Sequence, residues 1–576
     1  MVSPNLRQNK ETEEKISIND NTKKLFQVIY YDKQKKAAVD EDVPKISVSS
    51  LVSRLAFVYE KARNAVDYDE EHLLRKNAIA RILKRQVVIE GVIRQVEARE
   101  VSTHLLTELI RGGYLPNDSI PETKIEEVAF IFEKYIILKN ALSLELSTSF
   151  GFKTDISKTK DLIKEKSSLI SWILTLAACE IEENLAPAKV KKTVVTSMYD
   201  FLLNKVKLPH DLLQYEEAKD IQIYLSIARN YLKYDKDIIS FVLFKYYNGF
   251  WIDIGKNGGI DEHHREKIKK IAKNFVELKK EVDRQIKHPL TRQLDKITRT
   301  YSLCYNILTD AIEANPTELY HEMQKGEKSF SSSIVKVCNA KYNSAKAKLW
   351  RSAMRSIIYI FLTKSVFVFA VEVPAIRWFG EELHLIPLAI NIAFPAALLL
   401  FIVLTTKKPG SDNTEKIVSG IKEIAISGRE RTSNILLKRP RKRNLLSSII
   451  FNLVYFSAFS VSLYFIVQVL LFINFTWVSI LIFLFFLAFV SFFSVVTTKG
   501  VKDLMVVERR ESLLALLLDL FYLPIIIAGR WLSNNMSKVN LFVFIFDFII
   551  EAPFKIFVEI ADDWTRYVKE RRDNMD

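Results

Sequence analysis

The 576-residue chain has little of what marks several protein classes. Three cysteines, 15 glycines and 15 prolines are too few for a disulfide framework, a collagen repeat or a Pro/Gly-rich disordered chain. Cys179, Cys304 and Cys338 lie far apart and never in a CxxC spacing, which argues against a zinc ribbon or an iron–sulfur site. Because 49% of the residues are hydrophobic, we expect a largely ordered chain with three buried, reduced thiols.

Catalytic and nucleotide-binding motifs are also missing. No HExxH, GxSxG, GxGxxG or HRD pattern occurs. The segment Gly249–Asn257 resembles a P-loop only superficially, because its glycine spacing is wrong and Asn257 replaces the Ser or Thr that would hold Mg²⁺. One cluster has residue types that bind zinc: Glu262, His263, His264 and Glu266. Neighbouring side chains on a helix point about 100° apart, so we interpret this cluster as a solvated helix start. We expect no enzyme activity, metal or cofactor.

Charge is absent from one long stretch of the second half. No Lys, Arg, Asp or Glu occurs between Ile449 and Val496, and a membrane-crossing helix needs about 20 apolar residues. A break at Asn474–Trp477 predicts two spanning helices, Ile449–Ile473 and Val478–Val496. Upstream, Ile357–Ile376 and Leu385–Leu404 form a second pair of the required length.

Two further apolar segments carry interruptions. Leu513–Gly529 and Val539–Val558 contain charged residues and prolines, so they could span the membrane, re-enter it or lie at its surface. The sequence therefore predicts four to six membrane helices.

The orientation follows from the short loops between the predicted spans. The loop Thr405–Leu446 has 11 Lys/Arg against four acidic residues, whereas Arg377–His384 has one Arg against two Glu. Basic loops stay on the cytoplasmic side, so we expect both termini in the cytoplasm of a bacterial plasma membrane protein. The first 25 residues lack an apolar signal segment, and insertion is expected to rely on the first internal helix.

The predicted fold is all-α, with an N-terminal cytoplasmic helical domain followed by a module of four to six transmembrane helices. The predicted parts are a polar tail (1–22), a helical domain (23–350) with a subdomain boundary near 250–260, a first hairpin (351–404), a basic loop (405–446), a second hairpin (447–498) and an amphipathic, re-entrant or third hairpin segment (499–576).

Helical spacing of apolar residues supports the all-α prediction for the N-terminal part. One helix is expected to run from Asp69 as far as Ile110, and a charged helix from Asp261 to Lys287 is expected to act as a strut. Residues 26–31 could form a short strand, although no partner strand is evident. The charges of residues 1–350 are mixed in sign, whereas a nucleic-acid site needs a one-signed stripe. We expect no nucleic-acid partner.

Ionisable residues inside apolar segments are the strongest functional signal, because each costs at least ~2.5 kcal/mol at the bilayer centre. They suggest a polar pathway formed by Lys364, Glu372, Asp519, Asp547, Glu551 and Lys555. Glu372 and Glu551 both precede a proline by two positions, and a proline can open a polar notch in a helix. The alternative, which we favour from sequence, is that these charges lie at the membrane interface.

Basic residues flank the predicted spans and would suit anionic lipid headgroups. The candidate contacts are Lys346, Lys348, Arg351, Arg355, Lys438, Arg439, Arg441, Lys442 and Arg443. Ordinary retention of basic residues on the cytoplasmic side is a sufficient alternative explanation.

Three short runs carry a resemblance: Val58–Tyr68, Leu73–Leu83, and Pro409–Gly410 with Asn413–Glu415. They look like parts of uncharacterised multi-pass membrane proteins of small-genome bacteria. The resemblance implies a multi-pass membrane protein and brings no function or site with it.

Together these features predict a membrane-tethered interaction or scaffolding protein that recruits cytoplasmic proteins and could self-associate as a homo-oligomer. The main alternative is a channel or secondary transporter that uses the intramembrane charges.

Overall fold

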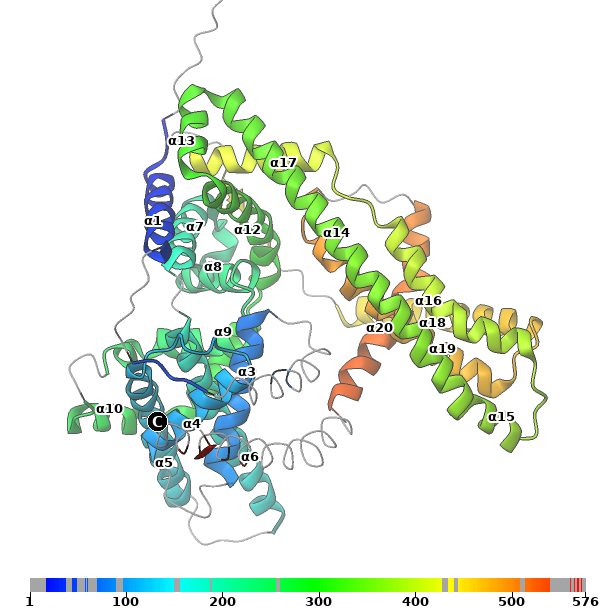
Figure 1. Ribbon diagram of the computed structural model, residues 1–576, viewed down its shortest axis with the longest axis horizontal. Coiled ribbons are helices and arrows are strands. Elements are labelled where there is room, and N and C mark those ends of the chain that lie inside the picture. The colour runs from blue at the N-terminus through cyan, green and yellow to red at the C-terminus, as the bar shows by residue number, and fades with distance from the viewer. Residues whose placement is uncertain are drawn as a thin grey trace, which may run out of the picture. The chain divides into compact units, whose positions relative to one another are not determined.

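The structure is a computed structural model that describes most of the chain as helix (Figure 1). The described residues are 17–37, 44–48, 57, 60, 70–89, 97–149, 156–186, 189–254, 259–426, 434–439, 444–507, 513–538, 560, 564, 567, 568 and 571. Within them, the only strands are the two-residue pair β1 (Val206–Lys207) and β2 (Ile435–Leu436). The prediction of a predominantly helical protein is confirmed.

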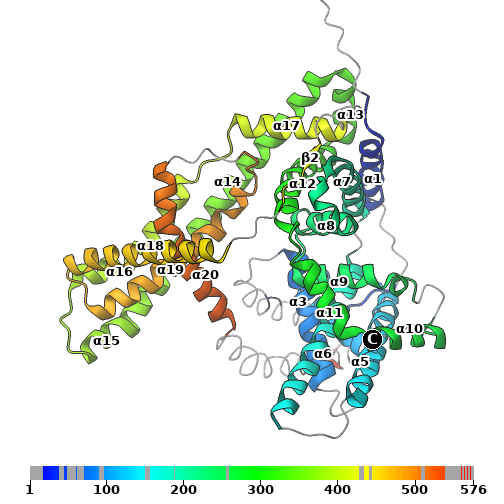
Figure 2. The ribbon, with the colours of Figure 1, turned by 180° about the vertical axis from the view of Figure 1, so that it is seen from behind.

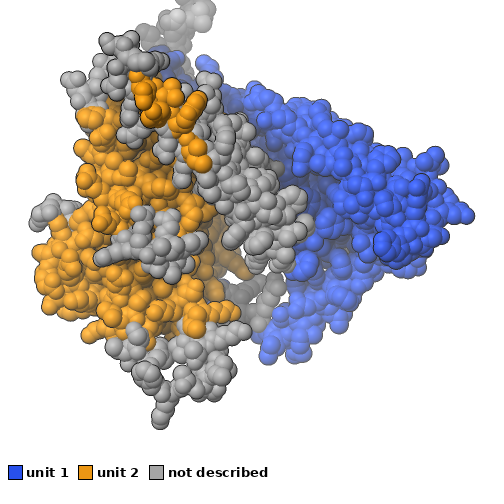
Figure 3. Space-filling view, turned by 60° about the horizontal axis from the view of Figure 1, so that its bottom comes forward, with its two compact units in different colours: residues 1–22, 303–432, 439–546 blue, residues 23–302, 433–438, 547–576 orange. Residues whose placement is uncertain are grey.

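The chain divides into two compact units (Figure 3). Unit 1 comprises residues 1–22, 303–432 and 439–546, and unit 2 comprises residues 23–302, 433–438 and 547–576. The division falls within helix α12 (Thr291–Ala314). Residue 350 lies inside the continuous helix α14 (Glu327–Phe367).

Unit 2 is a helical body. Its helices are α1 (Asp20–Ala37), α3 (Glu71–Lys84), α4 (Ala98–Arg111), α5 (Thr123–Ser149), α6 (Ile156–Leu185), α7 (Lys189–Lys205), α8 (Glu216–Asn230), α9 (Lys236–Tyr247), α10 (Glu262–Lys273), α11 (Phe275–Ile286) and the first half of α12. Shorter turns are the π-helix η1 (Arg85–Ile89) and the 3₁₀-helices η3 (His210–Tyr215) and η4 (Gly249–Ile252).

The core of unit 2 forms where α3 packs on α6 and where α4 and α10 pack on α5. Ile79, Phe132, Ile173 and Phe275 are fully buried in one apolar cluster. The burial of these apolar side chains is the main stabilising contribution to such a body. A parallel pairing of β1 with β2 adds residues 435–436, which the sequence placed in the basic loop, to this unit.

Three expectations for unit 2 are corrected. The backbone of Glu97 is extended, so α3 and α4 are separate helices instead of one helix from Asp69 to Ile110. The expected strut 261–287 is two helices, α10 and α11, and each has a buried apolar face. Residues 26–31 lie within α1, so the short strand is absent.

Unit 1 contains the apolar helices. In chain order it has α13 (Pro316–Lys325), α14, the π-helix η5 (Val368–Glu372), α15 (Val373–Trp378), α16 (Leu385–Thr405), α17 (Ser411–Ala425), α18 (Leu445–Phe472), α19 (Trp477–Lys502) and α20 (Leu513–Lys538). Within the described residues, four helical stretches are long and apolar enough to cross a membrane: Glu327–Trp378, Leu385–Thr405, Leu445–Phe472 and Trp477–Lys502. They contain the four spans predicted from the sequence, except that the third helix ends one residue before Ile473.

The helices of the two predicted hairpins pack against each other (Figure 2). Helix α14 contacts α16 and α19, and α16 contacts α19. The rings of Phe379 and Trp477 lie 4.8 Å apart and join the ends of the two hairpins. Helix α20 packs on α18 and α19. Its apolar portion, Leu520–Ser533, is shorter than a membrane-crossing helix. Residues 539–558 lie outside the described part of the chain.

The tail and the basic loop are more ordered than predicted. Ile18 is buried and pairs with Ile426, and the N–H of Asn19 donates to Ala425 O at 2.9 Å. The predicted polar tail 1–22 therefore ends before residue 18. The predicted basic loop 405–446 contains helix α17, whose Ile417 and Ile421 are fully buried.

Candidate functional site

Two of the predicted pathway residues lie inside the bundle of apolar helices. Lys364, near the end of α14, and Glu372, at the end of η5, are both 0% exposed. The interfacial interpretation favoured from the sequence does not fit these two side chains, because a residue that snorkels to the interface keeps its charged end in water. A polar site within the membrane unit fits their burial better.

The carboxylate of Glu372 is held by two other helices. Asn391 of α16 donates from Nδ2 to Glu372 Oε1 at 2.6 Å, and Ser479 of α19 donates from Oγ to the same oxygen at 2.6 Å. Asn391 is also 0% exposed. Among the described residues, Glu372 Oε2 and Asn391 Oδ1 have no hydrogen-bond partner. The site therefore combines two strong hydrogen bonds with two unsatisfied oxygens.

A π-helical turn brings Glu372 to the face of the helix that carries Lys364. In an α-helix, eight residues leave two side chains about 80° apart, whereas one extra residue in a π-turn reduces this to about 20°. The N–H of Val373 donates to Val368 O, five residues earlier. Pro374 follows directly, has no N–H and would crowd the preceding turn of a regular α-helix. The Glu-x-Pro pattern thus coincides with the π-turn.

Lys364 is buried without a carboxylate in contact. Its Nζ lies 3.8 Å from the ring centre of Phe486 and 5.7 Å from that of Phe367. Within the described residues Nζ has no hydrogen-bond partner, and no ion pair within 4.0 Å joins it to Glu372. The aromatic faces offer partial compensation for the cation. The positive charge of Lys364 acts on Glu372 through space, across an apolar medium that screens it poorly.

The rest of the predicted pathway is not assembled in the described part of the chain. Asp519 belongs to α20, but its side chain lies outside the described residues. Asp547, Glu551 and Lys555 lie outside them entirely. The sequence analysis missed Asn391 and Ser479, although a polar residue inside an otherwise apolar span is a detectable signal.

The candidate lipid contacts are exposed where they are described. Lys346, Lys348, Arg351 and Arg355 lie on α14 directly before its apolar portion. Lys438 and Arg439 are also exposed. The remaining three, Arg441, Lys442 and Arg443, lie outside the described residues.

Unit 2 contains a cleft of about 880 Å³ that the sequence did not indicate. Its walls come from α3, α6, α7, α8 and α9. Six aromatic rings line it: His72, Tyr199, Tyr224, Tyr234, Phe241 and Tyr246. Size and predominantly apolar lining are typical of ligand sites in proteins. No single segment of the chain contributes enough of the lining residues to form a recognisable sequence motif.

Charged residues in the wall of the cleft are largely paired. Arg75 donates from Nε and NH2 to Glu182, both at 2.6 Å, a forked geometry that fixes both side chains. Lys245 pairs with Glu183 at 2.5 Å. Burial, with Lys191 nearby, lowers the pKa of His72, and burial raises the pKa of Tyr234. Both rings are therefore neutral near pH 7.

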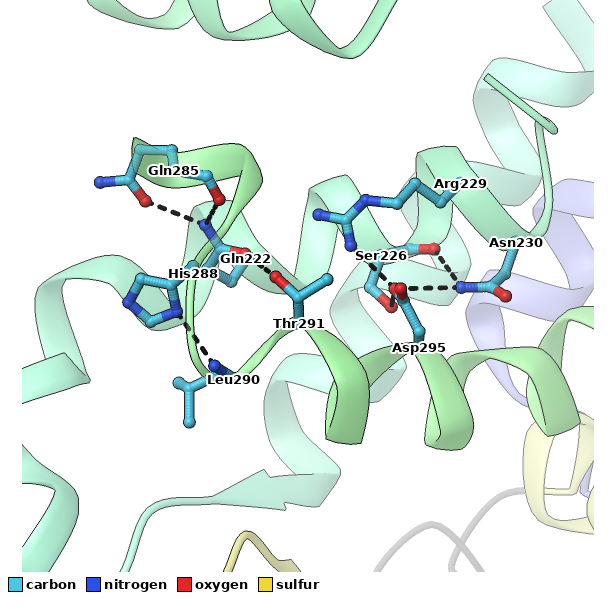
Figure 4. Close-up of polar contacts among 9 residues, drawn as sticks. All are labelled: Gln222, Ser226, Arg229, Asn230, Gln285, His288, Leu290, Thr291 and Asp295. Atoms are coloured by element: carbon cyan, nitrogen blue, oxygen red, sulfur yellow. Dashed lines mark hydrogen bonds and ion pairs between the residues drawn. The ribbon is translucent and has the colours of Figure 1, made fainter. Parts of the chain in front are cut away.

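A polar cluster of unit 2 links α8 to α11 and to the start of α12 by hydrogen bonds (Figure 4). Three side chains of α8 donate to Asp295 Oδ1: Ser226 at 2.8 Å, Arg229 at 2.8 Å and Asn230 at 3.2 Å. Gln222 Nε2 donates to the main-chain and side-chain oxygens of Gln285 at 3.0 and 2.9 Å. Such closed networks position helices, and we assign this one a structural role.

The other sequence candidates form no chemical site in the described chain. Asp261 caps α10 by accepting from the N–H of His264 at 2.8 Å, as a solvated helix start does. Among the described residues no three His, Cys, Asp or Glu side chains are grouped to hold a metal ion. The segment after Gly249 forms η4 and buries Trp251.

Comparison with known proteins adds no assignment: no protein-family model, curated protein or solved structure matches this chain.

Proposed function

We propose that the protein is an integral membrane protein that tethers a cytoplasmic helical binding domain to the membrane. The single observation that carries this proposal is the cleft of about 880 Å³ in unit 2, in a chain that also has four helices apolar enough to span a bilayer. The cleft would receive a cytoplasmic protein partner, and the apolar helices would anchor it.

The exposed side chains of the apolar helices support insertion in lipid. Phe472 and Trp378 are each 89% exposed, and many Leu, Ile and Phe side chains of α14 to α19 are exposed with them. A water-soluble surface does not present apolar patches of this extent. The exposed basic residues of α14 before its apolar portion would lie against anionic headgroups on the cytoplasmic side. A bacterial plasma membrane with both termini in the cytoplasm fits this charge distribution.

Site-specific photo-crosslinking in cells tests the recruiting role. Tyr246 lines the cleft and is 56% exposed, so a photoreactive amino acid at this position would capture a bound partner. Tyr320 of α13 is 39% exposed and is not among the residues that line the cleft, so it serves as the matched control position.

We expect a discrete adduct from position 246 that is absent from position 320. Adding Tyr199→Asp, which places a charge in the aromatic lining, should remove the adduct. No adduct at position 246, or the same adducts at both positions, would reject recruitment through this cleft.

A second function, transport through the membrane unit, is favoured by one observation: Glu372 is a fully buried carboxylate with an unsatisfied oxygen. Intramembrane ionisable groups that face a helix bundle commonly mark ion or proton routes. Purified protein in liposomes with imposed pH and alkali-ion gradients tests this function. Glu372→Gln should abolish flux, whereas Glu382→Gln, a change at an exposed loop carboxylate, should leave it intact. Equal flux in the wild type and Glu372→Gln would reject transport through this site.

A further inference from the structure

Apart from Asn391 and Ser479, buried apolar residues lie close to Glu372 along the helices that hold it. Val368, Ile376, Leu388 and Val478 form a buried cluster from η5, α15, α16 and α19. A bare carboxylate in such surroundings is strongly destabilising unless a positive charge or proton compensates it. The two hydrogen bonds from Asn391 and Ser479 reach only Oε1. The other oxygen needs a further partner.

The charges that face Glu372 are few. On its own helix the facing charge is Lys364, and Arg377 near the end of α15 is exposed. The apolar stretches of α16 and α19 that pack against it, 385–405 and 477–498, contain no charged or histidine residue. Among the described residues, neither Lys364 Nζ nor Glu372 Oε2 has a hydrogen-bond partner, and the two side chains form no ion pair within 4.0 Å. It balances the net charge of the site but leaves Oε2 unoccupied.

The unsatisfied atoms have a common chemistry. Glu372 Oε2 and Asn391 Oδ1 are hard oxygen acceptors, and both side chains are 0% exposed. Oxygen acceptors of this kind take a proton or a hard metal cation. An anion cannot satisfy either atom, because the carboxylate would repel it.

We propose that Glu372, together with Asn391 and Ser479, is the binding site for one monovalent cation, a proton or an alkali metal ion. Proton binding forms an O–H bond at Oε2 and neutralises the carboxylate, with the proton supplied by water. Alkali-ion binding leaves the carboxylate ionised and coordinates its free oxygen. The proposal is independent of both functions above, since a cation can bind without being carried across the membrane.

The test uses the purified full-length protein in lipid nanodiscs. Thermal unfolding is followed while pH is varied without alkali ions, and then while Na⁺ or K⁺ replaces a large organic cation at constant pH and ionic strength. A pH response alone identifies the proton, and an alkali-ion response identifies the metal ion. We expect a shift in Tm of roughly 2–4 °C for the wild type and the exposed-carboxylate control Glu382→Gln. Glu372→Gln, which has no carboxylate to protonate, should lose the shift.

Two further measurements keep the proposal testable if Glu372→Gln does not fold. Infrared difference spectra of the wild type between about pH 5 and about pH 9 should contain a carboxyl signal that moves in Ser479→Ala. Ser479→Ala retains the carboxylate but removes one donor, so it should shift the midpoint of cation binding about tenfold. An unchanged midpoint in Ser479→Ala would overturn the proposal. So would identical pH and alkali-ion responses in the wild type and Glu372→Gln.

Discussion

Lys364 and Glu372 are opposite charges buried in one helix bundle without an ion pair between them. Replacing Lys364 by Met should destabilise unit 1, because it leaves Glu372 without a balancing charge in a poorly screened medium. The double variant Lys364→Met/Glu372→Gln should recover part of the loss, and the coupling energy should be about 0.5–3 kcal/mol. Reversible unfolding in mixed detergent micelles measures all four members of the cycle.

Lys348→Met provides the control, since Lys348 is an exposed residue of the same helix. Its effect on the free energy of unfolding should stay within about 0.5 kcal/mol. If the two charge-removing changes at 364 and 372 are additive, Lys364 does not compensate Glu372 and the electrostatic argument is wrong.

The three cysteines are buried free thiols, as expected from the sequence. Burial raises the pKa of Cys304 to about 12 and that of Cys179 well above its usual range. We therefore expect slow modification of the folded protein by a maleimide even at about pH 9, and complete modification after denaturation. Because the unfolded thiols ionise first, the same shift lowers stability as pH rises above about 8.5. Fast labelling of the folded protein at pH 7 would contradict this burial.

At the residue scale the sequence identified the buried charges but not their surroundings. Lys364 and Glu372 are conspicuous because charge is costly in an apolar segment. Their burial depends on which side of α14 faces α16 and α19, and no local pattern states this. Asn391 and Ser479 became recognisable as partners only after three helices had been packed together.

Among the helices, the closest approach involves Gly529 of α20. A Cβ at this position would lie 1.9 Å from Ala488 O and 2.9 Å from Phe492 Cβ, both on α19. Small residues allow such backbone contact between apolar helices. Gly529→Ala should push α20 away from α19 and cost about 1–3 kcal/mol in detergent unfolding experiments.

Gly500→Ala is the matched change, because Gly500 also lies in a helix and a Cβ there meets nothing within 4 Å. It should be neutral or stabilising, since Ala favours helix over Gly by about 1 kcal/mol. Equal effects of the two substitutions would show that α20 does not pack on α19 through Gly529.

The existence of helices was more predictable than their ends. Continuous apolar composition located the four long apolar helices, because hydrophobicity is a local property of the chain. The division of 261–287 was not predicted, because its charged positions continue across Asn274 while Phe275 turns into the core. Tertiary packing overrides local helical preference at such positions.

For the molecule as a whole, the topology of the apolar helices is the first property to measure. Single cysteines at positions 382, 430, 475, 535 and 574 in a cysteine-free background report the side of the membrane. Positions 382 and 475 should label from the same side, because Phe379 and Trp477 meet at one end of the bundle. We expect that side to be the outside and position 430 to label from the inside, because the loop around 430 is basic. Outer labelling at 535 with inner labelling at 574 would indicate six spans.

Labelling of 382 and 430 from the same side would contradict the proposed orientation. Inner labelling at both 535 and 574 would limit the protein to four spans. The orientation of the spans was predicted from the distribution of Lys and Arg in the sequence alone. The cleft of unit 2 could not be predicted in the same way, because residues as distant as His72 and Tyr246 line it together.

Helix α14 joins two environments without a break. Phe330 and Cys338 are buried in its first part, and Lys364 lies near the other end of the same 41-residue helix. At 1.5 Å per residue, the helix is about 60 Å long. A rod of this kind passes torque along its axis, so a twist applied near Cys338 turns Lys364 relative to the fixed donors on α16 and α19. Such a rotation would change the electric field that Lys364 exerts at the carboxylate of Glu372.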